Sequence, residues 1–210
     1  MKNLNGVCAL VSGGASAVGS EVIRELVNRG ASVLAVDSTE ERIEEAIAKL
    51  DLENPDEIFT HALEGGDLVS WWDLGNLIAA YFHTLNLFVH VAEPTPSVPA
   101  RTLGLDALRE AEKTSCDSFL TAVARLEKYL VAASEEDEVG ANVVAVQPSA
   151  GDRSKDEAPG SVCHAMSLAL AEALTREYAE ADLNIRVHAV RPHETDASDS
   201  AVAIADVVGL

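Results

Sequence analysis

The sequence has few basic side chains, few cysteines and no long apolar run, and each shortage excludes a class of protein. Its 210 residues include 35 Asp plus Glu but only 15 Lys plus Arg, a formal net charge of −20 at pH 7. Nucleic acids and anionic membranes are polyanions, so they would be repelled. No stretch approaches the roughly 20 apolar residues of a membrane span, and the start does not resemble a secretory leader. We expect a cytoplasmic protein with no nucleic-acid or membrane partner.

The cysteines are an odd number, Cys8, Cys116 and Cys163, and they form no Cys-x-x-Cys pair. Their pattern indicates small buried side chains rather than redox or metal-binding groups. Hydrophobic residues make up 48% of the chain, which is too many for a disordered acidic tail. The length is typical of one domain with a single core, so we predict one domain over residues 1–210. The acidity fits a protein that works in high salt, and equally an ordinary soluble surface.

Short β-branched runs alternate with longer amphipathic stretches along the chain. Strands are predicted at 7–11, 32–36, 57–63, 87–92, 142–146 and 185–190. Helices are predicted at 17–28, 40–50, 70–83, 105–133 and 161–180. Several strands are apolar on both faces, as in parallel sheets that helices cover on both sides. The pattern predicts an α/β fold, a Rossmann-type doubly wound parallel sheet of six strands.

A glycine-rich turn lies between the first predicted strand and the first predicted helix. Gly13 permits a tight turn, and Gly19 lets the helix pack close to the strand. Main-chain amides at the helix start can hold a pyrophosphate; they belong to Ser16, Ala17 and Val18. Asp37 ends the second strand, where a carboxylate accepts hydrogen bonds from ribose hydroxyls and repels a ribose phosphate. The segment predicts binding of NAD rather than NADP; the alternative is a structural turn that binds nothing.

These motifs resemble the short-chain dehydrogenase/reductase family, over about residues 4–195. The family's Thr-Gly-x-x-x-Gly-x-Gly turn corresponds to 12–19, with Ala17 in place of the middle glycine, and 184–192 are similar to its Ile-Arg-Val-Asn-x-Val-x-Pro-Gly strand. The resemblance implies that NAD is the cofactor, with binding weakened by the Ala17 methyl group. It also implies that three further residues contact the cofactor. Glu64 would contact the adenine and Thr195 the nicotinamide carboxamide, and Ala92 would contact the cofactor from the end of the fourth strand.

The resemblance fails at the family's catalytic positions. The family's Asn-Asn-Ala-Gly reads His90-Val91-Ala92-Glu93, and its helical Asn aligns with Thr114. The Tyr-x-x-x-Lys pair aligns with Gly160 and His164, and a glycine has no proton to exchange. The tyrosines of the chain all fall in other predicted helical positions: Tyr81, Tyr129 and Tyr178. The resemblance therefore implies an NAD scaffold without its own hydride-transfer centre, acting as a non-catalytic or binding subunit.

Two alternatives to a non-catalytic subunit stay open. One is an NAD-dependent oxidoreductase with an atypical acid/base, for which Ser149 and His164 are the candidates. The other is a module whose dimeric state responds to NAD. A hydrolytic triad of Ser149, Asp152 and His164 lacks a nucleophile-elbow motif. A metal site at His193 and Glu194 lacks a second pair of ligands, so no metal is predicted.

The helix predicted at 161–174 is apolar around its whole circumference, whereas a helix packed by one face should be polar on the other. In the resembled family this helix and the preceding one pair two subunits. We therefore expect a homodimer, or a hetero-oligomer with an active relative, through 105–133 and 161–174. The ending, 197–210, leaves room for one short helix, so we expect no substrate-covering lid and no seventh strand.

Overall fold

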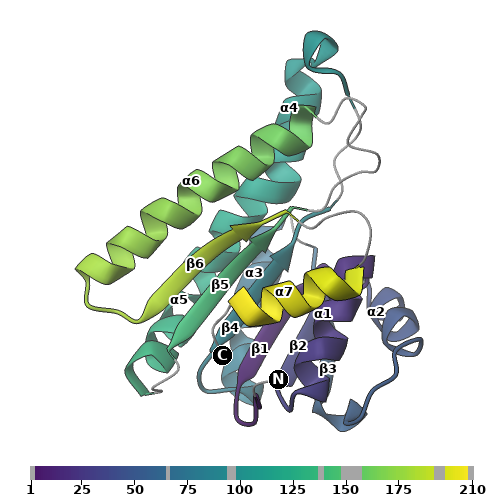
Figure 1. Ribbon diagram of the computed structural model, residues 1–210, viewed down its shortest axis with the longest axis vertical. Helices are drawn as coiled ribbons and strands as arrows, with labels where there is room; N and C mark the ends of the chain where they lie inside the picture. Colours follow the sequence, from purple (N-terminus) through teal and green to yellow (C-terminus); the bar gives the residue numbers. More distant parts are fainter. Residues whose placement is uncertain are drawn as a thin grey trace.

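The structure, a computed structural model, describes residues 3–64, 67–93, 98–136, 140–147, 158–191 and 197–207. Six parallel strands form one sheet in the order β3–β2–β1–β4–β5–β6 (Figure 1). They are β1 (Cys8–Ser12), β2 (Ser32–Asp37), β3 (Ile58–Ala62), β4 (Leu87–Val91), β5 (Ala141–Val146) and β6 (Ile185–Val190). The order reverses between β1 and β4, where open α/β sheets bind their ligands. The predicted doubly wound sheet is confirmed.

Helices cover both faces of the sheet (Figure 1). One face carries α1 (Ala17–Asn28), α2 (Glu40–Ile47) and α7 (Ala197–Val207). The other carries α3 (Leu68–Tyr81), α5 (Ser118–Glu136) and α6 (Ala158–Glu180). The remaining helical segments are short: η1 (Pro55–Glu57), η2 (Ala100–Thr102), α4 (Leu105–Glu112) and η3 (Lys113–Asp117).

The central strands are buried on both faces because their side chains alternate between two apolar cores. Leu10 and Phe88 point into the core that α3, α5 and α6 cover. Their neighbours Val11 and Val89 point into the core under α1, α2 and α7. Each strand residue on the central strands therefore buries apolar surface. Polar side chains buried on these strands include Ser12 and His90, which line the cavity described below, and Asn142 near the start of β5.

The helix predicted at 105–133 is three segments rather than one. α4 passes into η3, which is a π-helical turn, and η3 passes into α5. A π turn adds a residue to the helical turn and is common at functional sites. Here it brings Lys113 and Thr114 to the carboxyl edge of the sheet.

The last described helix, α7, packs along α1 and not over the carboxyl ends of the strands (Figure 1). Ala201 and Ile204 of α7 are buried in the core that α1 shares, and Arg24 Nη2 donates to Ser198 Oγ at 3.0 Å. This helix therefore completes the hydrophobic cover of the sheet and does not act as a lid. Among the described helices, none combines the length and the apolar character that crossing a membrane demands.

Candidate functional site

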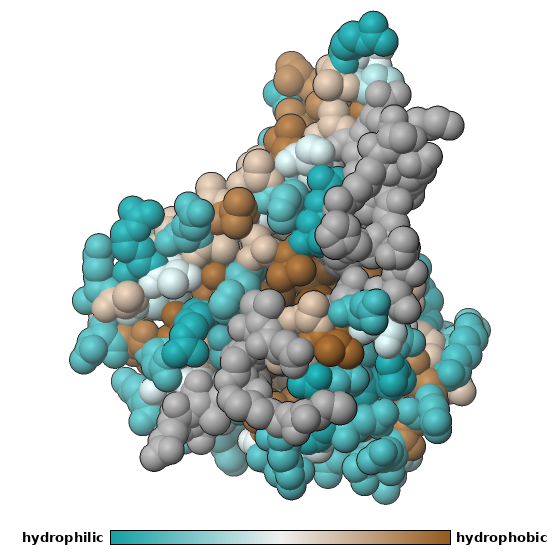
Figure 2. Space-filling view, in the orientation of Figure 1, coloured by the Kyte–Doolittle hydropathy of each residue, from teal (hydrophilic) through white to brown (hydrophobic). Residues whose placement is uncertain are grey.

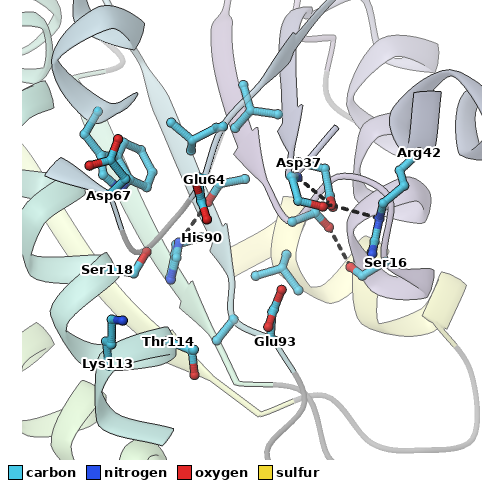
Figure 3. A pocket seen from close by; sticks show the side chains of 18 residues that line it. Ser16, Asp37, Arg42, Glu64, Asp67, His90, Glu93, Lys113, Thr114 and Ser118 are labelled. Atoms are coloured by element: carbon cyan, nitrogen blue, oxygen red, sulfur yellow. Dashed lines mark hydrogen bonds and ion pairs between the residues drawn. The ribbon is translucent and has the colours of Figure 1, made fainter. Parts of the chain in front are cut away.

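A cavity of about 570 Å³ opens at the carboxyl ends of β1, β2 and β4. Its walls come from the turn after β1, the ends of β2 and β3, the start of α3, the segment after β4, and η3 with the first residue of α5. Figure 3 shows Asp37 and Arg42 on one side of this cavity and Lys113, Thr114 and Ser118 on the other. The cavity therefore lies where the strand order reverses, between β1 and β4.

The turn after β1 needs glycine at two positions. Gly13 has φ +72°, and a Cβ there would run into the carbonyl oxygen of Val91. A Cβ at Gly19 would run into the carbonyl oxygen of Gly13. Ser16 locks the turn, because its hydroxyl donates to Gly13 O at 2.7 Å and accepts from Gly19 N at 3.0 Å.

The predicted residues of this turn divide into two groups. Gly13 and Ser16 line the cavity. Ala17, Val18 and Gly19 form the first turn of α1 and are not among the lining side chains. Their amides lie at a helix N-terminus, where the helix dipole favours an anion.

Asp37 joins the turn to the end of β2. Its Oδ2 accepts from Ala15 N at 3.0 Å, and its Oδ1 accepts from Ser38 N at 2.8 Å. Arg42 Nε lies 3.2 Å from Oδ1, with 59% of the arginine side chain exposed. Ser38 Oγ also donates to Oδ1 at 3.2 Å, so three groups already contact that oxygen. Oδ2 accepts only from Ala15 N among these contacts, and since a carboxylate oxygen offers about two acceptor directions, it keeps about one for a ligand hydroxyl.

Two more predicted positions also line the cavity. Glu64 follows β3, and Ala92 follows β4, where its amide donates to Val146 O at 2.9 Å. Asp67 and Glu93 add carboxylates that the sequence analysis did not assign to a site. The Ser70 hydroxyl, followed by the amides of α3, donates hydrogen bonds that lower the pKa of Asp67.

The charge around the cavity is negative overall. Among the described residues, its lining includes the carboxylates of Asp37, Glu64, Asp67 and Glu93 and the cations of Arg42 and Lys113. In the described residues no group of three or more His, Cys, Asp or Glu is placed to hold a metal ion.

His90 is a buried polar side chain in the cavity wall that the sequence analysis treated only as a departure from the family pattern. It pairs in register with Ser12, whose hydroxyl lies 2.8 Å from His90 Nδ1. Burial lowers the pKa of His90 to about 4, so the ring is neutral. Because Ser12 Oγ can donate to Nδ1, this contact fits the tautomer with hydrogen on Nε2. The one available signal was a histidine inside an otherwise apolar five-residue strand.

His164, one of the two predicted acid/base candidates, is not among the side chains that line the cavity. His164 is half-buried on α6, and burial followed by the Arg191 charge lowers its pKa. Arg191 Nη1 donates to Ser161 Oγ at 3.3 Å one turn earlier. The remaining predicted positions lie outside the described residues: Ser149, Asp152, His193, Glu194 and Thr195.

The three tyrosines are described, and none lines the cavity. Tyr81 stacks on Phe59 at the end of α3, with ring centroids 4.6 Å apart. The Tyr129 hydroxyl donates to Gly75 O between α5 and α3. Tyr178 lies near the end of α6, and burial raises its pKa to about 12. Among the described residues that line the cavity there is therefore no phenol.

Comparison with a family model shows the family of this chain, and comparison with solved structures shows its fold. The sequence matches the short chain dehydrogenase family over residues 7–206. The fold is similar to that of a metagenomic short-chain oxidoreductase (SDR) solved in complex with NADP. The TM-score is 0.77 and the sequence identity 15%, and the alignment covers 99% of this chain and 92% of that chain. It is also similar to hydroxysteroid dehydrogenase from Escherichia coli, with TM-score 0.71 and 16% sequence identity. That alignment covers 94% of this chain and 80% of that chain. No curated protein matches the sequence.

Proposed function

Since the chain belongs to the short-chain dehydrogenase family, we propose that it binds NAD(H) in the cavity and is an oxidoreductase whose acid/base is not a tyrosine. The observation that carries the proposal is the pairing of the glycine turn with Asp37. Gly13 and Ser16 of the turn line the cavity next to the N-terminus of α1, and Asp37 at the adjacent strand end keeps an acceptor direction on Oδ2. These are the two chemistries that a pyrophosphate and a ribose diol require.

The preference for NAD over NADP follows from the charge of Asp37. A ribose phosphate at this position would face a carboxylate, whereas ribose hydroxyls would donate to it. Arg42 is the nearest cation, but its guanidinium is already paired with Asp37 at 3.2 Å. The related oxidoreductase solved with NADP belongs to the same fold, so the choice of cofactor rests on this chain's own carboxylate.

His164 is the acid/base that we propose. Its lowered pKa leaves the imidazole neutral at pH 7, so the ring can both accept and donate a proton. The preceding residue, Cys163, contacts Cys116 of η3, the segment that forms one wall of the cavity. His164 follows Cys163 on the same turn of α6, although its side chain is not among those that line the cavity.

A second candidate function is the non-catalytic subunit. The placement of all three tyrosines away from the cavity favours it, because the family's proton donor is then missing. In that case the chain would hold NAD(H) but transfer no hydride by itself.

The outer surface of α4 and α6 supports a further part of the proposal, self-association or pairing with an active relative. Figure 2 shows apolar side chains along both helices, and the exposed ones are Leu105, Val162 and Leu168. The substitution Leu168→Glu should shift the chain toward monomer in light scattering. Val69→Glu is the matched control, because Val69 is also exposed but lies on α3. If both variants keep the wild-type mass, α6 is not the interface.

Calorimetry with NAD, NADH and NADP tests the cofactor site. We expect NAD to bind more tightly than NADP, and Asp37→Ser to remove most of that difference. Asp106→Ser is the control, because Asp106 is an acidic residue of α4 outside the cavity lining. No measurable affinity for any dinucleotide would overturn the proposed function.

Turnover separates the two candidate functions. Carbonyl reduction is followed as NADH absorbance over a panel of ketones and aldehydes. His164→Ala should abolish turnover while leaving NADH affinity unchanged, and His83→Ala, at an exposed position after α3, should retain turnover. Unchanged turnover in His164→Ala removes His164 from the mechanism. NADH binding by the wild type without turnover supports the non-catalytic subunit.

A further inference from the structure

Two thiols meet where α6 crosses the cavity wall. Cys116 belongs to η3 and Cys163 to α6, and both are buried, with 1% and 0% of their surface exposed. They share a small apolar cluster with Ala111 and Met166, separate from the two main cores. Cys116 Sγ donates to the carbonyl oxygen of Cys163 at 3.7 Å, which brings the two cysteines into contact.

The helix face on which Cys163 lies permits a close approach. Buried residues here include Gly160, Cys163 and Ser167, all of which are small. The axes of packed helices lie about 8–10 Å apart, and the side chains at the contact decide where in that range they fall. A disulfide needs Cα atoms about 4.4–6.8 Å apart, a separation that small residues at a crossing make accessible.

The two thiols differ in acidity, as a reactive pair requires. Hydrogen bonding with the Cys163 thiol, assisted by Ser115 and Ser167, lowers the pKa of Cys116 to about 7. The same contact, together with burial, raises the pKa of Cys163. Cys116 is therefore the thiolate of the pair, and the thiolate is the form that attacks an oxidant.

We propose that Cys116 and Cys163 are a modification site, at which a peroxide produces an intrachain disulfide between η3 and α6. The Cys116 thiolate attacks one oxygen of hydrogen peroxide, the O–O bond breaks, and the sulfur becomes a sulfenic acid while hydroxide leaves and takes up a proton as water. The Cys163 thiol then attacks this sulfur, the S–O bond breaks, and the hydroxyl leaves with the thiol proton as a second water. Two thiols are oxidised and one peroxide is reduced.

The disulfide would tie the wall of the cavity to the helix that carries His164. η3 contributes Lys113 and Thr114 to the cavity lining, and Cys116 is two residues beyond Thr114. The bond would close a loop from residue 116 to residue 163, which contains the whole of β5. The chemistry uses only these two side chains, so it does not depend on whether the cavity binds NAD(H).

Peptide mapping after peroxide treatment tests the proposal. Trypsin separates the three cysteines, since Cys116 falls in peptide 114–125, Cys163 in 156–176 and Cys8 in 3–24. We expect one linked pair of peptides, 114–125 with 156–176, that dithiothreitol separates. Cys8→Ser is the matched control and should retain the link, whereas Cys116→Ser and Cys163→Ser should each lose it.

Alkylation of the oxidised wild type gives a second measurement that needs no variant to fold. After unfolding in iodoacetamide without reductant, only Cys8 should be labelled. Labelling of all three cysteines, a sulfinic acid at Cys116 without a linked peptide, or a link that survives in Cys163→Ser would each overturn the proposal.

Discussion

Replacing Gly13 by alanine tests whether the turn after β1 depends on both backbone conformation and close contact. Gly13 has φ +72°, and a methyl group there would overlap the Val91 carbonyl oxygen and lie 3.1 Å from Val91 Cβ. Gly6 has a similar φ of +83° but no atom within 4 Å of such a methyl group. Gly6→Ala therefore carries the conformational cost alone, and Gly13→Ala carries that cost together with the steric one.

The magnitudes follow from these two costs. A left-handed conformation costs an alanine about 1–2 kcal/mol, and overpacking adds about 1–3 kcal/mol. For a chain of this size, 1 kcal/mol shifts the midpoint of thermal unfolding by about 2–4 °C. We expect Gly6→Ala to lower Tm by about 2–8 °C and Gly13→Ala by about 4–20 °C, always more than Gly6→Ala.

Thermal unfolding followed by circular dichroism measures both effects, and calorimetry of NAD binding follows on the folded variants. Gly13→Ala should also weaken NAD binding, because the turn that directs the α1 amides must move away from Val91. Gly6→Ala should leave NAD binding unchanged, since Gly6 is outside the cavity lining. Equal Tm values for the two variants would refute the steric part of the reasoning.

Three further predictions concern charge, protonation and packing. Because the protein carries a net charge of −20 and the cavity four carboxylates against two cations, NAD affinity measured by calorimetry should rise from about 0.1 M to 1 M salt; a fall would contradict net repulsion. The folded pKa of His90 lies below the unfolded value, so its contribution is present above pH 6.5 and is lost as pH falls toward 4. This contribution amounts to about 2 kcal/mol of the free energy of unfolding between pH 7 and pH 5. In urea unfolding, the free energy of unfolding of His90→Asn should therefore fall by about 2 kcal/mol less than that of the wild type over this range. Trp71→Ala should lower the free energy of unfolding by about 3–5 kcal/mol because Trp71 is fully buried. Trp72→Ala should cost about 1 kcal/mol or less, because Trp72 is 59% exposed and stacks only under Arg125; similar losses in the two variants would refute this assignment.

The sheet was predictable because strands that are buried on both faces are apolar at nearly every position, which is visible in the sequence. The run 87–91 contains only one polar residue, and no half-exposed strand has that composition. The adjacent Trp71 and Trp72 show the same logic on a helix. Two neighbouring positions on a helix cannot both face the core, and the structure buries the first ring and exposes the second.

The wall formed by η3 was not predictable, because a π turn leaves no mark on helical periodicity over so few residues. The periodicity of 105–133 therefore predicts one long helix and no place in the site for Lys113. The contact between Cys116 and Cys163 was missed for a related reason. Their separation of 47 positions carries no spacing rule, since the contact arises only where α6 crosses η3.

The cavity residues that lie close together in the sequence were predictable, and those that come from distant segments were not. Gly13, Ser16 and Asp37 lie within one βαβ unit, where the chain itself sets their distances. Glu93, Asp67 and Lys113 come from three separate segments that only the folded sheet brings to one edge.

The charge of these three side chains bears on which part of NAD(H) each could face in the proposed binding mode. Asp67 is an N-cap, and its lowered pKa means that it stays ionised at pH 7. An ionised carboxylate beside a pyrophosphate costs binding energy, whereas beside an adenine amino group or a ribose hydroxyl it accepts a hydrogen bond. Lys113, on the opposite wall, has the reverse preference. The proposed mode therefore places adenosine between Asp37 and Asp67 and the phosphates toward the α1 amides, and Lys113→Glu should weaken NAD more than adenosine.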